Sequence, residues 1–366
     1  MGSPAVIFGG RSPEHDISIL TGLLVERALS AGGRAPVSLY WSKTNEWFEV
    51  DAGLEAKDFP AEGVPRKSRP LRLVAGTGFV GDAGALRKER ALDISAAVVC
   101  CHGAPGEDGT LQAALDLAGV RYTGPDMAAA ALGMDKLALG AVAESAGLRV
   151  LPRVGVVPEE GWAPPFAGPY IVKPRFGGSS IGIETVADAP TILALVRNSV
   201  HLRGGAVVEP YRGSAVDLEI AVRTYPQLQL SAIAKPERTG AIYTYNQKYV
   251  GGEGMLSAPR EMNPELPGEG EKVVREAATT IAALARVRGV ARVDFLLDGE
   301  DIYFNEVNTI PGSLAKYLWV SPAVPILDLL DDMVAEAVER PTTRWSTVGA
   351  DGTALRSAGT IAGKLG

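Results

Sequence analysis

A predicted β-hairpin near the C-terminal end of the chain is the feature that most restricts its fold. Two short runs of β-type residues flank residues 298–301 (Asp-Gly-Glu-Asp), which are typical of a tight turn. Side chains alternate between the two faces of a strand. Arg292 and Asp294 therefore share one face of the first strand, and Glu306 and Asn308 share one face of the second. The hairpin is thus expected to carry these polar residues on one side only.

The expected pairing brings two acidic side chains together. If residues 298 and 302 pair, Asp294 lies opposite Glu306 with Cβ atoms about 5 Å apart, and the arginine lies opposite the asparagine. Two carboxylates that close repel each other unless a cation lies between them. Carboxylate and amide oxygens suit a hard divalent cation such as Mg²⁺, brought in on the phosphates of a nucleotide. The alternative interpretation is a hairpin with one solvated, charged face.

Length and composition limit the class of protein. A chain of 366 residues predicts two or three domains, and 46% hydrophobic with 22% charged residues is typical of a globular protein. A net charge of −7 argues against a nucleic-acid partner. No apolar run approaches 18 residues, so we expect no membrane association and a cytoplasmic location. Cys100 and Cys101 are adjacent and predicted to be reduced core residues.

Two turns in the first third of the chain carry polar groups after a strand. The first forty residues have a strand–helix–strand order, which predicts a parallel sheet. Glu14 lies in the turn between that first strand and helix, where it could bind a ligand or simply complement the helix dipole. His102 begins a glycine-rich turn over residues 102–109 after the strand of residues 96–101. It could cap backbone groups, and a His, a Glu and an Asp in one such turn make a ligand site an equal alternative.

A glycine–serine loop in the middle of the chain is a candidate phosphate site. Residues 175–182 follow a predicted strand over residues 170–174 and offer backbone N–H groups and hydroxyls to phosphate oxygens. Lys173, on that strand, strengthens this interpretation. The sequence contains no Walker-type GxxxxGK[ST] loop. By itself, such a loop is more often only a flexible turn.

A second glycine motif needs a different explanation. Residues 76–81 match the GxGxxG pattern of dinucleotide sites. The next strand should then end in an acidic residue, but the strand of residues 96–101 ends in Cys-Cys-His. We interpret residues 76–81 as a glycine-rich hairpin, and an NAD-dependent enzyme is the alternative that this motif leaves.

The motifs occur in an order that is specific to one family. The chain contains, in sequence, a Gly-Gly turn with Glu14, His-Gly-x-x-Gly-Glu-Asp-Gly, Met-Asp-Lys, Lys-Pro with Gly-Ser-Ser, Tyr-x-x-Lys-Tyr, Arg-Val-Asp-Phe and Asn-Glu-Val-Asn-Thr-Ile-Pro-Gly. In this order they resemble the D-alanine–D-alanine ligases of the ATP-grasp superfamily, from residue 4 to about residue 340.

The resemblance implies an α/β (α+β) ATP-grasp fold in three parts. An N-terminal parallel-sheet domain would cover residues 1–125, and a central ATP-lid domain would cover residues 126–212. A C-terminal mixed-sheet catalytic domain would cover residues 213–340, followed by a tail over residues 341–366. ATP would lie between the central and C-terminal domains.

The resemblance also assigns the ligands of ATP and metal. The ATP-binding residues would be Lys136, Lys173, Ser180, Glu209 (at the adenine), Asp217 (at the ribose) and Lys248 (at the γ-phosphate). Because this chain carries extra residues before Asp217, Glu219 stays open as the ribose-binding acid. Asp294, Glu306 and Asn308 would ligate Mg²⁺, usually two ions in this family, and Mn²⁺ would serve in their place.

The implied reaction activates a carboxylate with ATP. Phosphoryl transfer makes an acyl phosphate, and a second substrate's amine attacks it through a tetrahedral oxyanion. Arg292 and the backbone N–H of Gly312 resemble the family's oxyanion donors. Glu14, Ser179 and Tyr249 resemble its hydrogen-bonded triad at the first amino acid, and His102 resembles the residue near that substrate's carboxylate.

The acceptor side departs from the family's pattern. Tyr317 occupies the position of a serine that binds the acceptor's carboxylate, and Lys316 lies next to it. The resemblance as a whole still implies a D-alanine–D-alanine ligase that makes cell-wall precursors. Such an enzyme would act on small amino acids, and we expect it to be a homodimer. The alternatives are a ligase on the same scaffold with another donor or acceptor in specialised metabolism, and a non-catalytic ATP-binding module.

Overall fold

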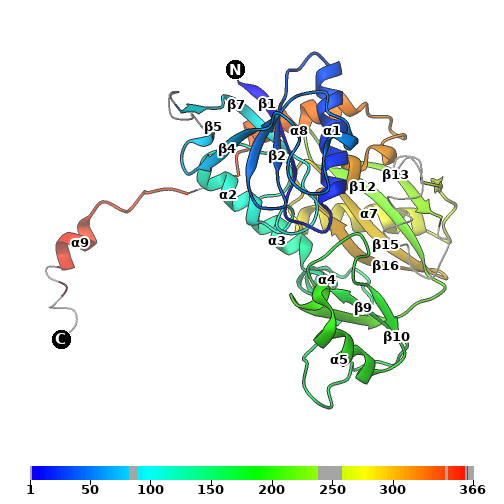
Figure 1. Cartoon of the computed structure of the whole chain (residues 1–366). Helices are drawn as coiled ribbons and strands as arrows, with labels where there is room; N and C mark the ends of the chain where they lie inside the picture. The colour runs from blue at the N-terminus through cyan, green and yellow to red at the C-terminus, as the bar shows by residue number, and fades with distance from the viewer. Residues whose placement is uncertain (1, 82–88, 238–257, 343–344, 359–360, 362–366) are drawn as a thin grey trace.

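The computed structural model describes residues 2–81, 89–237, 258–342, 345–358 and 361, whose strands form three sheets (Figure 1). The first sheet has the order β6-β5-β4-β3-β2-β1-β7. Its strands are β1 Ser3–Gly9, β2 Val37–Trp41, β3 Trp47–Val50, β4 Arg69–Val74, β5 Gly78–Gly81, β6 Arg90–Ala91 and β7 Ile94–Val99. β1 pairs in parallel with β2 and β7, and the outer strands pair antiparallel. The predicted parallel pairing is therefore confirmed for three strands only.

The GxGxxG segment is a hairpin, as predicted. β4 and β5 pair antiparallel, with Leu73 opposite Phe79, and the N–H of Thr77 donates to the carbonyl of Val74 at 3.0 Å. Strand β5, which begins at Gly78, follows this turn directly. The segment therefore lacks the strand–turn–helix geometry that a dinucleotide site requires.

Two turns of the first sheet come together because their strands are parallel neighbours. Helix α1 (His15–Ala31) follows β1, and helix α2 (Thr110–Ala118) follows the turn after β7. Parallel strands end at one edge of a sheet, so the turns before α1 and α2 meet there. Ser12 Oγ donates to the carbonyl of His102 at 2.8 Å and links them.

The second sheet forms the small lobe at the bottom of Figure 1. It is antiparallel in the order β10-β9-β11-β8, with β8 Val154–Gly155, β9 Tyr170–Pro174, β10 Glu184–Val186 and β11 Ala206–Pro210. Helix α5 (Ala189–Asn198) and the short helix η2 (Val200–Leu202) pack on it through Ile192 and Leu202. Its Gly-Ser loop, between β9 and β10, points toward the larger body.

The third sheet carries the predicted hairpin. Its order is β14-β13-β12-β15-β16, with β12 Val216–Arg223, β13 Gln229–Pro236, β14 Arg260–Met262, β15 Val290–Asp298 and β16 Asp301–Asn308. All strand pairs of this sheet are antiparallel. The one parallel contact among the described residues that supports the expected mixed sheet is an isolated bridge between Val150 and Phe304. Helix α7 (Gly270–Leu284) covers the apolar face, where Val293 and Phe295 are buried.

The pairing of the hairpin differs from the prediction at the turn and agrees at the polar residues. Asp298 pairs with Asp301 instead of residue 302, which leaves a two-residue turn. The register then shifts between Asp294 and Phe295, so that Asp294 does lie opposite Glu306. The tighter turn would have moved every side chain of β16 to the other face, and the bulge restores the predicted faces.

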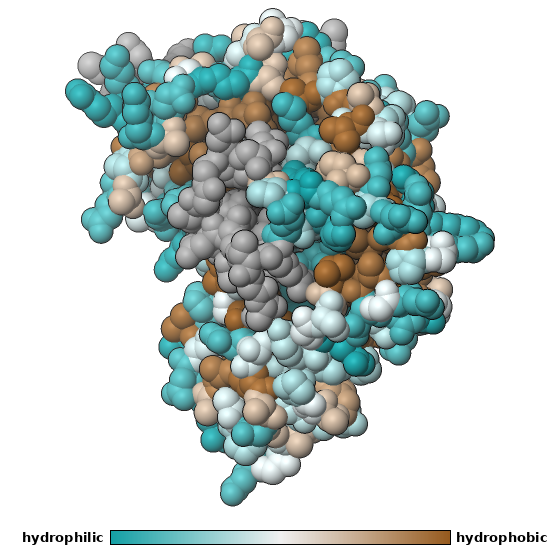
Figure 2. Space-filling view, turned by 90° about the vertical axis from the view of Figure 1, so that its right-hand side faces the viewer, coloured by the Kyte–Doolittle hydropathy of each residue, from teal (hydrophilic) through white to brown (hydrophobic). Residues whose placement is uncertain are grey.

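The structure describes further helices outside the three sheets. They are α3 Met127–Met134, α4 Lys136–Ser145, α8 Ile326–Glu339, α9 Thr353–Ala358, and the short helices η1 Ala56–Asp58 and η4 Gly312–Leu318. α9 lies away from the body in Figure 1. In the view of Figure 2, mostly hydrophilic residues cover the surface, with separate apolar patches between them. Within the described residues, every helix is too short or too polar to span a bilayer.

Candidate active site

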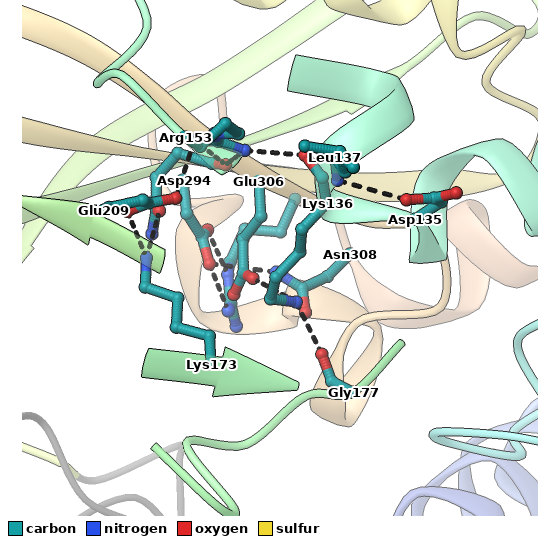
Figure 3. Close-up of polar contacts among 12 residues, drawn as sticks. Asp135, Lys136, Leu137, Arg153, Lys173, Gly177, Glu209, Asp294, Glu306 and Asn308 are labelled. Carbon is teal, nitrogen blue, oxygen red and sulfur yellow. Dashed lines mark hydrogen bonds and ion pairs between the residues drawn. The ribbon is translucent and has the colours of Figure 1, made fainter. Parts of the chain in front are cut away.

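The polar face of the hairpin holds an arginine, two acids and an amide side by side. Arg292 donates to both carboxylate oxygens of Asp294, from Nε and from Nη2, at 2.7 Å each. Asn308 Nδ2 donates to Asp294 Oδ2 at 2.9 Å. Arg292, Glu306 and Asn308 also line one small pocket. The structure therefore brings together all four residues that alternation placed on this face (Figure 3 labels the acids and the amide).

The acids of this face have a chemistry that suits a divalent cation. Burial raises the pKa of Asp294 to about 6 against the opposing effect of Arg292, and Glu219 and Glu306 add to the rise. A cation would relieve this crowding of negative charge. No group of three or more His, Cys, Asp or Glu with ligand spacing exists among the described residues. Asp294, Glu306 and the Asn308 amide oxygen instead fit Mg²⁺, which takes few protein ligands and shares the rest with phosphate and water.

A cleft between the second and third sheets matches the expected place of ATP. From the second sheet it is lined by Lys173, Ile171, Ile181, Glu209 and Tyr211, and from the third by Asp217, Glu219, Asp294, Leu296 and Asn305, with Lys136, Leu151 and Ser180 nearby. Apolar side chains lie on both walls, Ile171 and Ile181 on one and Leu296 on the other. The two lysines bring positive charge to the end that adjoins the acids of the hairpin.

The two lysines already contact acidic partners. Lys136 Nζ lies 2.8 Å from Glu306 Oε2 and donates to the carbonyl of Gly177 at 2.5 Å (Figure 3). Lys173 Nζ donates to Glu209 Oε2 at 2.8 Å and to Asn305 Oδ1 at 3.2 Å. Both ammonium groups therefore lie between the Gly-Ser loop and the third sheet, which is where the prediction placed the phosphates.

Glu209 lines this cleft, and its carboxylate is paired with two cationic side chains. It is 1% exposed, and Lys173 and Arg153 lie 2.8 and 3.1 Å from its two oxygens. Burial alone would raise the pKa of Glu209, but Lys173 and Arg153 outweigh burial and hold that pKa below its usual range.

Two residues of this cleft were missed by sequence reasoning. Arg153 is buried and donates to the carbonyls of Lys136 (2.8 Å) and Asn305 (3.3 Å), besides its ion pair with Glu209. Asn305 precedes Glu306, and regular alternation would turn it to the opposite face, but the bulge in β16 lets it reach Lys173. Neither residue has a sequence signal, since both roles depend on contacts between separate segments.

A second, smaller pocket lies on the other side of Arg292. Glu14, His102, Ser179, Arg292 and Gly312 line it, together with Glu107, Glu306, Asn308 and Ile310. Ser179 Oγ donates to the carboxylate of Glu14, which joins the Gly-Ser loop to the turn before α1. Two members of the predicted triad thus meet. The third, Tyr249, and the predicted phosphate ligand Lys248 lie outside the described residues.

His102 has both ring nitrogens engaged. Its Nδ1 donates to the carbonyl of Ile310 at 2.7 Å, so its Nε2 accepts from Thr21 Oγ1 at 2.8 Å. Burial lowers the pKa of His102 to about 4, and the ring is neutral at neutral pH. His102 therefore borders the small pocket and fixes the backbone on the way to Gly312.

A neighbouring acid acts on the same segment. Glu107 accepts from the N–H of Ile310 at 2.9 Å and from the N–H of Gly103 at 3.2 Å. Burial raises the pKa of Glu107 to about 7, and the nearby carboxylate of Glu14 adds to the rise. Sequence reasoning noted this acid only as part of its glycine-rich turn.

The turn after the hairpin has a left-handed backbone. Ser313, Leu314 and Ala315 have φ values of 51°, 51° and 50°, which L-residues seldom adopt. The N–H of Ser313 donates to Thr21 Oγ1 at 3.1 Å, and Leu314 and Ala315 are buried. Packing against α1 therefore holds a conformation that the local sequence would not choose.

The two predicted acceptor residues leave this turn in different settings. The hydroxyl of Tyr317 lies 3.1 Å from Arg292 Nη1 and 3.1 Å from Glu219 Oε2, and the residue is buried. Lys316 is half-buried. Tyr317 thus contacts the arginine of the hairpin instead of lining the small pocket. Both candidate ribose ligands, Asp217 and Glu219, line the larger cleft.

The three sheets, with a cleft between the second and third that two lysines line, define an ATP-grasp fold. Models of the D-ala D-ala ligase N-terminus and C-terminus match residues 4–125 and 162–333. The chain belongs to the D-alanine–D-alanine ligase family.

Individual relatives span nearly the whole chain. A D-alanine–D-alanine ligase of Methylobacterium sp. (strain 4-46) is 32% identical over 362 residues, covering 92% of this chain and 91% of its own. One from Bradyrhizobium sp. (strain ORS 278) is 30% identical over 358 residues, with 92% and 95% covered. Among solved structures, D-alanyl-alanine synthetase A from Vibrio cholerae has a TM-score of 0.76 at 20% identity, covering 93% and 99%. The VanG D-Ala:D-Ser ligase from Enterococcus faecalis has 0.74 at 24%, covering 92% and 99%.

Proposed function

We propose that this protein is an ATP-dependent ligase that joins two D-alanine molecules through an acyl phosphate, releasing ADP and phosphate, for peptidoglycan precursor synthesis. The observation that carries the proposal is the position of the Arg292–Asp294–Glu306–Asn308 set. It lies between the cleft that Lys136 and Lys173 line and the small polar pocket, so that a phosphate and a carboxylate entering from the two sides would meet at it.

The cleft residues bind the nucleotide in this proposal. Lys136 and Lys173 hold the phosphates under the Gly-Ser loop with Ser180, and Asp217 binds the ribose. Bound Mg²⁺ would be held by Asp294, Glu306 and Asn308 and would neutralise charge on the phosphates. Two ions are our expectation, with Mn²⁺ as a substitute. Lys248 is assigned to the γ-phosphate by the family resemblance.

The small pocket takes the first amino acid. Glu14, with Ser179 and Tyr249, holds its ammonium group and fixes the loop over the site, which excludes water from the acyl phosphate. Gly312 N–H and Arg292 stabilise the oxyanion that forms when the second amine attacks, because donors fixed in advance stabilise developing charge. His102, neutral and doubly hydrogen-bonded, positions the turn at the donor's carboxylate.

The acceptor is the least constrained part of the proposal. Lys316 and Tyr317 replace the family's serine pattern, which favours a second candidate, a ligase on this scaffold with another donor or acceptor. Purified protein should be assayed for ADP release across D- and L-amino acids and D-hydroxy acids. Turnover with D-alanine alone is expected, and its absence would refute the first candidate in favour of the second.

A non-catalytic ATP-binding module makes an opposite prediction. Such a protein has no use for the Arg292 donor, so Arg292→Ala would leave every measurable activity unchanged while ATP still bound. We expect loss of ligation. The proposal also includes a cytoplasmic location and a homodimer, both from the family resemblance, and light scattering of the purified protein tests the dimer.

A further inference from the structure

Tyr317 lies between two buried charges of opposite sign. Its oxygen accepts from Arg292 Nη1 at 3.1 Å and its single proton is donated to Glu219 Oε2 at 3.1 Å. A guanidinium can only donate and a carboxylate can only accept, so this direction is fixed. The Arg260 guanidinium carbon lies 3.9 Å from the centre of the Tyr317 ring and holds the ring from its face.

The hydroxyl acts as a spacer. Glu219 Oε1 already lies 3.7 Å from Arg292 Nε, in a region where both residues are about 5% exposed. At such burial a direct ion pair is strongly attractive. Without the hydroxyl, Glu219 would be drawn closer to Arg292 and compete with Asp294, which accepts two 2.7 Å hydrogen bonds from Nε and Nη2 of the guanidinium.

The backbone delivers the ring to this place. The left-handed turn of residues 313–315 brings Tyr317 back under the sheet, and Ser313 is tied to Thr21 on α1. Glu219 lies on β12 and Arg292 lies on β15, and these two strands pair with each other in the sheet. Three separate segments therefore converge on the tyrosine hydroxyl.

We propose that Tyr317 is a positioning residue for Arg292: by holding Glu219 at its 3.7 Å approach, it keeps the guanidinium aimed at the oxyanion. This inference rests on the proposed function, because it takes Arg292 as the oxyanion donor. It differs from a role of Tyr317 in binding the acceptor. A positioning role affects the rate of amide formation, whereas a binding role affects the KM of the acceptor.

Tyr317→Phe removes the hydroxyl and keeps the ring. Tyr225→Phe is the matched control, because the Tyr225 hydroxyl also donates to a glutamate, Glu339, at 2.9 Å, and Arg340 lies 5.1 Å from its ring centre. We expect Tyr317→Phe to lower kcat by about 10- to 100-fold, the effect of one hydrogen bond to a charged group. The KM values for ATP and acceptor should stay within about twofold of wild type, and Tyr225→Phe should match wild type.

Product ratios and a second variant sharpen the test. If amide formation slows while phosphoryl transfer continues, water takes more of the acyl phosphate, and the ratio of ADP to ligation product rises in Tyr317→Phe. Adding Glu219→Gln to Tyr317→Phe removes the competing charge and should recover part of the lost kcat. Thermal unfolding of each variant verifies that it is folded.

Each contrary outcome overturns the proposal. A raised acceptor KM at unchanged kcat would assign Tyr317 to the acceptor, and kinetics equal to those of Tyr225→Phe would leave it no role in the reaction. A double variant slower than Tyr317→Phe would exclude the spacer mechanism. The comparison uses whichever substrate pair the wild-type protein turns over, so failure of D-alanine would refute the proposed function and leave this test intact.

Discussion

Replacing Arg292 with lysine separates the charge of this side chain from its geometry. Lysine keeps one positive charge beside Asp294 and Glu219, but it is a point charge without the planar fork. Arg292 makes two 2.7 Å hydrogen bonds to Asp294 and one of 3.1 Å to Tyr317. The ammonium can replace one of these contacts, and two are lost.

The expected costs follow from those contacts. A hydrogen bond to a charged group contributes about 1.5–3 kcal/mol, so the loss of two should lower the free energy of unfolding by about 2–4 kcal/mol, allowing for relaxation. The effect on rate should be larger, because removal of a directed oxyanion donor lowers kcat by about 10²- to 10³-fold. The KM for ATP should change little, since Arg292 lines the small pocket and is absent from the lining of the nucleotide cleft.

The assay compares kcat with urea unfolding, using Arg223→Lys as the control. Arg223 lies on β12 of the same sheet and also bonds to a carboxylate, Asp332, at 2.6 Å, and to Gln229 at 2.8 Å. The control should lose stability and keep its kcat. If Arg292→Lys loses stability but keeps kcat within about threefold of wild type, Arg292 only neutralises buried acids and the oxyanion assignment is wrong.

Three further outcomes are expected. Glu306→Gln should raise the Mg²⁺ concentration needed for half-maximal activity by at least about tenfold through loss of a charged ligand, whereas Glu300→Gln, in the exposed turn of the same hairpin, should not. Lys173→Met should raise the KM for ATP by about tenfold or more through loss of a phosphate-binding cation, as measured by ADP release. The low pKa of His102 makes the folded state lose stability as pH falls from about 6.5 to 4, and the high pKa of Glu107 makes it gain stability as pH falls from about 7 to 4.5. Glu107→Gln removes this gain, so its free energy of unfolding, measured with urea, should fall more steeply from pH 7 to 4 than that of the wild type. An unchanged pH dependence would contradict the assigned protonation states.

The nucleotide cleft illustrates how far a local pattern reaches. Lys173, near the end of its strand, and the glycine–serine loop after that strand are contiguous in the sequence. The sequence alone therefore placed a cation beside backbone N–H groups and hydroxyls that can donate hydrogen bonds to a phosphate. The resemblance places Glu209 at the adenine, and the structure shows its carboxylate between Lys173 and Arg153. Arg153 comes from a separate segment, directly before β8, and no spacing in the sequence relates the two residues.

The hairpin shows both sides of this limit. Alternation along a strand is fixed by backbone geometry, and it correctly placed Arg292 with Asp294 and Glu306 with Asn308. The pairing between the strands depends on the turn, and residue 298 pairs one position earlier than predicted. The bulge that corrects the faces, and that turns Asn305 toward Lys173, is a feature of the assembled sheet.

The sequence by itself determined which chemical groups the protein has and which neighbours share a face, because the periods of strands and the order of motifs are local properties of the chain. Only the tertiary structure decided that Tyr317 meets Arg292 and Glu219, and that His102 is held by Thr21 and Ile310. Those contacts join segments up to 208 residues apart. They exist because sheets and helices pack in one arrangement, and a buried polar group then takes whatever partner that packing brings within hydrogen-bonding distance.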